Sequence, residues 1–475
     1  MRRRTLEELA GLMGGKLDGQ VATDEVASGA SIDTRTLRSG DLFFALPGTR
    51  THGKQHAGAA LSRGAAAVVV DEPLPTSGPR IVVDDVANAM ARLAQHVRRE
   101  ESTRVPCAVI TGSLGKTTTC RYASELLRTV GVAHRPPGSF NNHLGVPLTI
   151  LAAPEECGFL IVEIGANRDG EVRTLAEWAQ PKVACVTAIA PVHLDGFGDL
   201  DGVAREKLSI LESLPEDGEG WLPVEASRRY GSLLSNVSAR LRTFGRGGDL
   251  EITPLSAVPG RTPRYRLRFG HDEPPMTFEW DPPFEHSARN LEAALAVVAG
   301  LGVPPEAVLD QIGSLTLPPL RGEVREHGGT ELILDCYNSS PTALESAIDK
   351  LEREPASGRR IAVLGTMEEL GEHEASWHQA IGERLANSTI DEVFLMGRAR
   401  DWFQWGLERN GRAGVYLDHT ESSARQLAAD LKPGDRVLFK ASRSEALEEF
   451  AAMVAKFLDA SESSAAETEH VVRKS

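Results

Sequence analysis

A short glycine-rich segment, TGSLGKTTT at residues 111–119, constrains the fold more than any other part of the sequence. It follows an apolar run, VPCAVIT (105–111), and precedes a stretch of helical character. Glycines let backbone N–H groups approach phosphate oxygens, while a lysine and a threonine supply a cation and a magnesium ligand. The loop is two residues shorter than the common GxxxxGKT form, and a plain turn is the alternative. Strand, loop and helix together favour a nucleotide phosphate site in a parallel α/β sheet.

Short apolar runs bounded by turn residues recur along the chain, a pattern typical of parallel strands covered by helices on both faces. In the centre these runs are GFLIVEIG (158–165) and KVACVTAIA (182–190). Towards the C-terminus they are ELILD (331–335), RIAVLG (360–365), EVFLMG (392–397) and DRVLFK (435–440). The pattern predicts an α/β protein.

The spacing of these runs predicts three domains and a tail. The polar stretch RREESTR (98–104) and the adjacent prolines of TLPPLRGE (316–323) mark two boundaries. Residues 219–284, which include the alternating RYRLRF, are expected to form a β-rich insertion. We therefore predict a small N-terminal α/β domain, a central domain and a third α/β domain, followed by a disordered tail, at 1–103, 104–316, 317–460 and 461–475. The third domain has no GxGxxG after its first strand, so a bound dinucleotide is not indicated.

Charge and composition argue against several classes of protein. The chain has 52 basic and 67 acidic residues, a net charge of −15, which disfavours a sequence-independent nucleic-acid binder. No apolar run approaches the ~20 residues of a membrane span, and the first residues lack the apolar core of a signal peptide. We therefore expect a cytoplasmic protein. The 5 cysteines are widely spaced, so neither a disulfide framework nor a thiolate zinc site is indicated.

Two polar residues stand at the ends of the central apolar runs: Glu163 in FLIVEIGA and His193 in TAIAPVHLD. Ligands of open α/β sheets bind outside the carboxyl ends of the strands, so these residues would converge with Lys116 and Thr117 if the strands are neighbours. A carboxylate and an imidazole could then complete two magnesium sites beside the phosphates. Each residue alone has an ordinary alternative, because Glu163 could simply end a strand and His193 could hydrogen-bond a turn.

With these residues in place, the chain resembles the Mur ligase family, the ATP-dependent amino-acid and peptide ligases of cell-wall precursor synthesis. The resemblance covers nearly the whole chain. Besides TGSLGKTTT it rests on SIDTRTLRSGDLFFALPG (31–48), SFNNHLGVPLT (139–149), VEIGANRDGEV (162–172), VHLDGFG (192–198), REKLSIL (205–211), RGE (321–323), LDCYNSSP (334–341), VLGTMEELG (363–371) and FKASRS (439–444). The NNHLGVPLT, VEIGANR, YN-x-x-P and ELG elements are similar to the branch that adds D-alanyl-D-alanine.

The resemblance implies a domain plan and a reaction. An N-terminal domain would hold the UDP part of UDP-N-acetylmuramoyl-tripeptide. A central P-loop ATPase domain with a parallel sheet would follow, and then a Rossmann-like C-terminal ligase domain. The tripeptide carboxylate would attack the γ-phosphate of ATP to give an acyl phosphate, which the amine of D-alanyl-D-alanine then attacks. The resemblance also implies Mg²⁺ and a carbamylated Lys207 that binds the second metal ion. Without the resemblance, the sequence favours a solvated helix lysine at Lys207.

The resemblance also implies the residues of each site. Asn290 would meet adenine, Asp335 the ribose and Arg321 the phosphates. The ATP site would contain Gly112, Ser113, Gly115, Lys116, Thr117, Thr118, Asn290, Arg321 and Asp335. The catalytic residues would be Lys116, Glu163, His193 and Lys207, and the metal ligands Thr117, Glu163, His193 and Lys207. The precursor site would contain Asp33, Thr34, Arg35, Asn141 and Asn142, with Tyr337 and Asn338 on the dipeptide side.

Several positions depart from the family pattern, and they leave the amine donor open. Ser287 stands in place of an asparagine, Thr366 in place of an aspartate, and YNSSP and KASR replace YNANP and KGSR. One alternative is a related ligase with a different amino-acid or dipeptide donor, and another is a non-catalytic homologue that binds the precursor. A small-molecule kinase would leave the first and third domains unexplained. We expect a monomer, and the third residue of the tripeptide is open between diaminopimelate and lysine.

Overall fold

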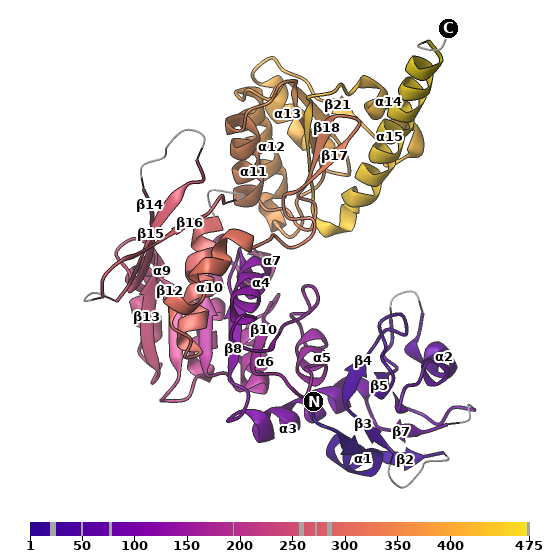
Figure 1. The fold of residues 1–475 in the computed structure, drawn as a ribbon, viewed down its shortest axis with the longest axis vertical. Coiled ribbons are helices and arrows are strands. Elements are labelled where there is room, and N and C mark those ends of the chain that lie inside the picture. The colour runs from indigo at the N-terminus through magenta and orange to yellow at the C-terminus, as the bar shows by residue number, and fades with distance from the viewer. Residues whose placement is uncertain are drawn as a thin grey trace. The chain divides into compact units, whose positions relative to one another are not determined.

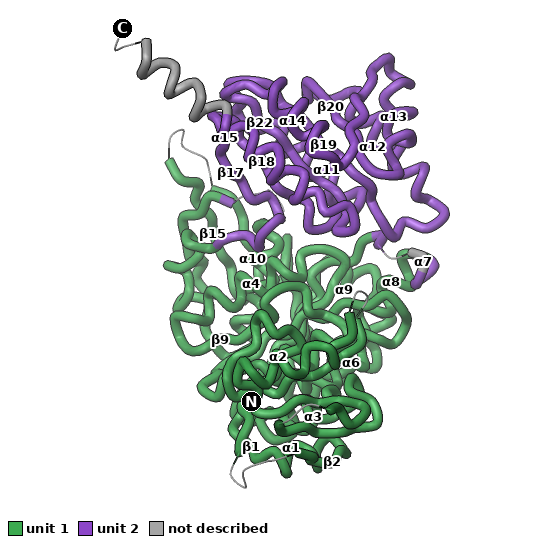
Figure 2. The backbone as a smooth tube through the Cα atoms, turned by 90° about the vertical axis from the view of Figure 1, so that its right-hand side faces the viewer, with its two compact units in different colours: residues 1–190, 199–281, 286–315 green, residues 191–198, 282–285, 316–475 purple. Residues whose placement is uncertain are grey.

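The computed structural model describes residues 1–19, 25–48, 51–75, 78–192, 194–255, 261–270, 273–282 and 287–472, without the side chains of 194–195 and 461–472. Its described strands form three sheets of mainly parallel strands and one two-stranded pair (Figure 1). The chain divides into two compact units, unit 1 with residues 1–190, 199–281 and 286–315, and unit 2 with residues 191–198, 282–285 and 316–475 (Figure 2). The predicted α/β class is confirmed.

The N-terminal part of unit 1 is built on a five-stranded sheet of order β2-β7-β6-β5-β4, in which only β2 runs antiparallel to its neighbour. Strand β6 is continuously apolar and β5 is apolar after Asp41, and both are buried along their whole length. The elements are β1 (Arg4–Thr5), α1 (Leu6–Met13), β2 (Lys16–Asp18), β3 (Val26–Ala27), β4 (Gly29–Ser31), β5 (Asp41–Phe44), η1 (Gly53–His56), α2 (Ala57–Ser62), β6 (Ala67–Val70), β7 (Arg80–Val82) and α3 (Val86–Glu101).

The central part of unit 1 is a nine-stranded sheet of order β16-β15-β14-β13-β12-β11-β8-β10-β9. The strand before the glycine-rich loop, β8, lies between β10 and β11, and both pair with it in parallel. The elements up to η2 are β8 (Cys107–Thr111), α4 (Lys116–Leu127), β9 (Ala133–His134), α5 (Gly145–Leu151), β10 (Phe159–Glu163), α6 (Glu171–Ala179), β11 (Val183–Val186), α7 (Leu194–Phe197), α8 (Leu200–Leu208) and η2 (Ser209–Ser213). The carboxyl ends of three neighbouring strands therefore meet beside the loop.

The described part of segment 219–284 is rich in strands, as predicted, and these strands continue the central sheet. Strands β12, β13 and β14 pair in parallel, whereas the pairs β14–β15 and β15–β16 are antiparallel. Strand β12 is mostly buried and pairs with β11. The remaining elements are β12 (Glu219–Pro223), α9 (Val224–Tyr230), η3 (Gly231–Leu234), β13 (Arg240–Phe244), β14 (Leu250–Pro254), β15 (Arg264–Phe269), β16 (Met276–Glu279), α10 (Ser287–Gly300), η4 (Pro305–Ala307) and η5 (Leu309–Ser314).

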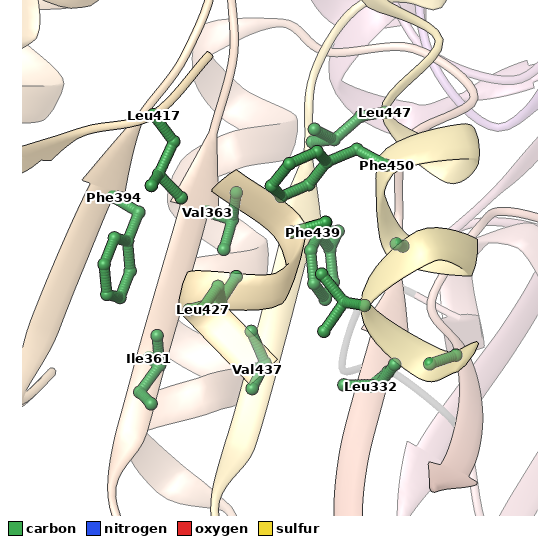
Figure 3. Packing of buried hydrophobic residues seen from close by; sticks show 14 of the residues in the cluster. Leu332, Ile361, Val363, Phe394, Leu417, Leu427, Val437, Phe439, Leu447 and Phe450 are labelled. Carbon is green, nitrogen blue, oxygen red and sulfur yellow. The ribbon is translucent and has the colours of Figure 1, made fainter. Parts of the chain in front are cut away.

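Unit 2 contains a six-stranded sheet of order β17-β18-β22-β19-β20-β21, parallel except for the edge strand β17. One apolar cluster joins this sheet to α14 and α15, and Figure 3 shows Phe439 and Phe450 packed within it. A second cluster joins the sheet to α11, α12 and α13. The elements are β17 (Glu323–His327), β18 (Thr330–Leu334), α11 (Pro341–Arg353), β19 (Arg360–Leu364), η6 (Gly371–His373), α12 (Glu374–Ala386), β20 (Glu392–Leu395), α13 (Arg400–Glu408), β21 (Val415–Tyr416), α14 (Glu421–Asp430), β22 (Arg436–Lys440), η7 (Arg443–Glu445) and α15 (Leu447–Val472).

The last helix, α15, continues to Val472. Disorder from residue 461 stays a prediction. Among the described residues, no helix combines the length and the apolar character needed to cross a membrane.

Buried Glu292 makes the stability of unit 1 depend on pH. It is 5% exposed on α10, and its Oε1 accepts the N–H of Ile252 on β14 at 2.8 Å. Burial raises the pKa of Glu292 from 4.5 to about 7. Between these values the folded state binds more protons than the unfolded state, so stability falls as pH rises through this window.

We expect Glu292→Gln to remove this dependence while keeping the acceptor for Ile252. At about pH 8 the variant should be more stable by about 3 kcal/mol, because no charge is then buried. Urea unfolding at about pH 5 and pH 8 measures the change, with exposed Glu279 on β16 replaced by glutamine as the control. Identical pH dependence in Glu292→Gln and the unchanged protein would contradict this explanation.

Candidate active site

The glycine-rich loop joins β8 to α4 in a conformation that requires glycine at two positions. Gly112 and Gly115 have φ values of 143° and 82°. A Cβ atom would lie 2.1 Å from Thr187 Oγ1 at Gly112 and 2.2 Å from Asn290 Oδ1 at Gly115. Because Gly115 is the N-cap of α4 and has no side chain to cap it, the first-turn N–H groups are suited to bind an anion.

The side chains of the loop divide between anion binding and support. Lys116 begins α4, and its Nζ donates to Gly112 O at 2.6 Å, so the ammonium lies over the loop. Ser113 Oγ donates to Ala190 O at 2.8 Å and accepts the Ala190 N–H at 2.9 Å. Ser113 thus braces the loop against the segment after β11, a support that the sequence did not indicate. Thr118 is buried in the first turn of α4.

Glu163 stands at the carboxyl end of β10, where it pairs in register with Ile110 of β8. It is 1% exposed, and its Oε1 accepts from Asn141 Nδ2 at 2.8 Å. Its Oε2 is buried with no hydrogen-bond partner among the residues that the structure describes. A buried carboxylate oxygen of this kind is suited to a hard cation such as Mg²⁺. The donor set present therefore fits the magnesium ion that the resemblance implies.

The segment after β9 connects Glu163 to the start of α4. Thr117 Oγ1 lies 3.1 Å from Ser139 Oγ, and Asn141, two residues further on, contacts Glu163. Asn142 has a different role, since its Oδ1 accepts the N–H groups of Leu144 and Gly145 at the start of α5. Asn141 therefore contacts Glu163, and its place at the precursor site stays a prediction.

Lys207 is buried on α8, and both its burial and the charge of Lys116 affect its pKa. It is 1% exposed. Burial, followed by the positive charge of Lys116, lowers the pKa of Lys207 from 10.5 to about 7, while Glu206 and Glu171 oppose this shift. A lysine with such a pKa is largely an uncharged amine at slightly alkaline pH, which is the form that reacts with carbon dioxide.

His193 lies outside the described residues, so its place in the site stays a prediction. Within the described ranges, no three His, Cys, Asp or Glu side chains form a group that could hold a metal ion. Unit 1 contains Thr117, Glu163 and Lys207. It also contains Asn290 of α10, whose side chain lies against Gly115. The described residues therefore place one buried carboxylate, Glu163, on the strand next to β8, and the complete set of metal ligands stays a prediction.

The residues expected at the UDP group lie in the turn that follows β4. Arg35 Nη2 forms an ion pair with Asp33 Oδ2 at 2.6 Å, and the Arg35 side chain is 85% exposed. Thr34 O accepts from Arg63 Nη1 at 2.9 Å. Arg63 is thus a further cation at this turn, and nothing in the sequence singled it out.

In unit 2, a second group of polar residues follows β18. Asp335 Oδ2 pairs with Lys440 Nζ at 2.7 Å, and Lys440 is 1% exposed. The Arg321 guanidinium carbon lies 4.5 Å from the centroid of the Tyr337 ring, and Asn338 O accepts from Lys440 Nζ at 3.2 Å. Two predicted residues, Asp335 and Asn338, thus contact Lys440, and Arg321 contacts Tyr337. The FKASRS motif was the only signal in the sequence for Lys440.

Comparisons with known proteins match this chain over most of its length. Three family models match the chain. The model described as "Mur ligase family, catalytic domain" matches residues 26–98, and the "Mur ligase middle domain" matches residues 110–298. The model described as "Mur ligase, glutamate ligase domain" matches residues 320–443. The chain is 32% identical over 458 residues to the UDP-N-acetylmuramoyl-tripeptide--D-alanyl-D-alanine ligase of Bacillus subtilis (strain 168), covering 94% of this chain and 98% of the relative.

Solved structures give the same result. A crystal structure of MurF from Acinetobacter baumannii matches with a TM-score of 0.81 and 25% identity, covering 96% of this chain and 99% of that chain. MurF ligase from Thermotoga maritima in complex with ADP matches with a TM-score of 0.74 and 27% identity, covering 92% and 99%. This chain belongs to the Mur ligase family.

Proposed function

We propose that this chain ligates D-alanyl-D-alanine to UDP-N-acetylmuramoyl-tripeptide with consumption of ATP, giving the pentapeptide precursor, ADP and phosphate. One observation carries the proposal: buried Glu163 presents an unpartnered carboxylate oxygen beside a lysine-bearing phosphate loop. The relatives named for this reaction, which match over most of the chain, give that site its substrates.

The first step is phosphoryl transfer to the terminal carboxylate of the tripeptide. The loop amides and Lys116 hold the β- and γ-phosphates, so negative charge that develops on the γ-phosphate is stabilised. Glu163 would hold Mg²⁺ with Thr117, His193 and the carbamate of Lys207. When bound, Mg²⁺ neutralises phosphate charge and orients the γ-phosphate. The carboxylate oxygen bonds to phosphorus, and ADP leaves.

The second step forms the amide. The uncharged amine of D-alanyl-D-alanine attacks the acyl carbon, and a tetrahedral intermediate forms. When it collapses, phosphate leaves with the oxygen that joined it to carbon and takes up the proton that the amine loses. The chain contributes position and charge rather than a nucleophile. Cys336, the cysteine nearest Asp335 in sequence, is 0% exposed, and burial raises the pKa of its thiol to about 12, so it is not a nucleophile here.

The proposal assigns the remaining predicted residues to substrates. Asn290 meets adenine, Asp335 the ribose, and Arg321 the phosphates. Asp33, Thr34, Arg35, Asn141 and Asn142 serve the precursor, and Tyr337 and Asn338 lie on the dipeptide side. A monomeric state and a cytoplasmic location belong to the same proposal.

The carbamate on Lys207 has its own test. In bicarbonate enriched in carbon-13, we expect a carbamate resonance in the carbon-13 NMR spectrum, since the pKa of Lys207 is lowered to about 7. The resonance should be lost in Lys207→Ala and kept in Lys182→Ala, which removes an exposed lysine from unit 1. A spectrum that is the same in all three proteins would contradict carbamylation of Lys207.

The reaction is tested by phosphate release from ATP. We expect release only when UDP-N-acetylmuramoyl-tripeptide and D-alanyl-D-alanine are both present, with the pentapeptide detected by mass spectrometry. Turnover with a different amine donor, and none with D-alanyl-D-alanine, would favour the related ligase instead. Binding of ATP and precursor without turnover for any donor would refute a ligase function.

A further inference from the structure

The N-terminus of α6 is capped by a side chain from another helix. Gly170 is the N-cap of α6, has a φ of 84° and provides no side-chain acceptor. The N–H of Gly170 donates to Glu206 Oε2 at 2.7 Å, and the N–H of Val172 donates to Glu206 Oε1 at 2.7 Å. Both carboxylate oxygens of Glu206, which lies on α8, therefore satisfy first-turn donors of α6.

This cap is favourable in energy and well shielded from water. Glu206 is 4% exposed, so its hydrogen bonds are protected from competition by solvent. A carboxylate at a helix N-terminus is stabilised by the helix dipole and by charge-assisted hydrogen bonds. Helices α6 and α8 also pack against each other, so the cap fixes an existing contact in one register.

The capped segment connects two parts of the candidate active site. It begins at Glu163, and Asn141 holds that end, because Asn141 O accepts the N–H of Gly165 at 2.8 Å and Asn141 Nδ2 donates to Glu163 at 2.8 Å. Glu206 holds the other end at Gly170. The residue after Glu206 is Lys207, which is buried on α8.

We propose that Glu206 is a positioning residue for the metal site. By capping α6 from α8, it holds Lys207 at a fixed place relative to Glu163 and the phosphate loop. Lys207 as a metal ligand rests on the proposed function, whereas the cap itself is a feature of the structure. Residues that orient metal ligands typically change metal affinity by about 10- to 100-fold when replaced.

Glu206→Gln tests this role with little change in volume. The glutamine oxygen can accept one of the two N–H groups, but its amide nitrogen faces the other as a second donor. In bicarbonate buffer containing ADP, we expect Mn²⁺ binding measured by electron paramagnetic resonance to weaken by about 10-fold. The control is Glu212→Gln, which removes an ion pair with Arg173 on α6 but no backbone cap, and should bind Mn²⁺ as the unchanged protein does.

A double-mutant cycle separates positioning from a general structural effect. If Glu206 acts through Lys207, adding Glu206→Gln to Lys207→Ala should not weaken Mn²⁺ binding further. Equal weakening with and without Lys207 would overturn the proposal, as would unchanged Mn²⁺ affinity in folded Glu206→Gln. Circular dichroism verifies the fold of each variant.

If Glu206→Gln does not fold, Glu206→Asp replaces it in the same cycle. Aspartate keeps the charge but is one methylene shorter, so it retracts α8 or loses the cap, and Mn²⁺ binding should weaken. A folded aspartate variant with unchanged affinity would overturn the proposal. None of these measurements needs turnover, so they stand apart from the ligation assay: failure of that assay refutes the proposed function, while failure of the cycle refutes only the role of Glu206.

Discussion

Lys116→Ala is expected to lower kcat for ligation by about 1000-fold, the largest loss predicted for any single residue. Lys116 Nζ lies over the phosphate loop through its hydrogen bond to Gly112 O. Without the ammonium, charge that develops on the γ-phosphate loses its nearest fixed cation. The KM for the tripeptide should change little, since the lysine acts on ATP. Steady-state phosphate release with both substrates measures the loss.

The matched control is Lys182→Ala in the same unit. Lys182 is 41% exposed and pairs with Asp217, so its removal should leave kcat unchanged within about twofold. The free energy of unfolding of both variants should lie within about 1 kcal/mol of that of the unchanged protein. A Lys116→Ala variant that retains more than about a tenth of the activity would contradict the role of the phosphate loop.

Glu163→Gln should lower kcat by about 100- to 1000-fold through loss of an anionic metal ligand. The amide oxygen can still accept from Asn141 Nδ2, so the local hydrogen bond is kept. The unpartnered oxygen becomes an NH₂ group, which cannot bind a cation. We therefore expect a higher Mg²⁺ concentration for half-maximal rate together with the lower kcat.

Exposed Glu177 on α6 provides the comparison for Glu163. Its side chain is 52% exposed and pairs with Arg173, so Glu177→Gln should not change the Mg²⁺ dependence. If Glu163→Gln has the Mg²⁺ dependence of the unchanged protein, Glu163 is not a metal ligand, and its unpartnered oxygen has another cause.

The parts of the fold that depend on local patterns could be predicted from the sequence. The continuous apolar runs of β8, β10 and β11 identify buried parallel strands, and glycines at 112 and 115 mark the loop. The continuity of 219–284 with the central sheet was missed. The Gly and Pro in β12 weaken its strand signal, and its place in the sheet depends on parallel pairing with β11, which the local sequence does not show.

The site was predictable in its charged residues but not in their supports. Lys116 and Glu163 follow from motif and strand position. Glu206 could not be found this way, because its partners are backbone N–H groups 34 and 36 residues earlier, which carry no side-chain signature. The brace from Ser113 to Ala190 likewise depends on β11 lying next to β8. The expected role of His193 as a metal ligand stays a prediction.

The transfer of oxygen-18 from the tripeptide to phosphate tests the central claim most directly. With both oxygens of the terminal carboxylate labelled, an acyl phosphate passes one label to the released phosphate and leaves the other in the new amide. We predict one oxygen-18 per phosphate, formed in step with labelled pentapeptide and absent without D-alanyl-D-alanine. Unlabelled phosphate formed during pentapeptide synthesis would show that ATP does not activate this carboxylate, and would contradict the proposed reaction.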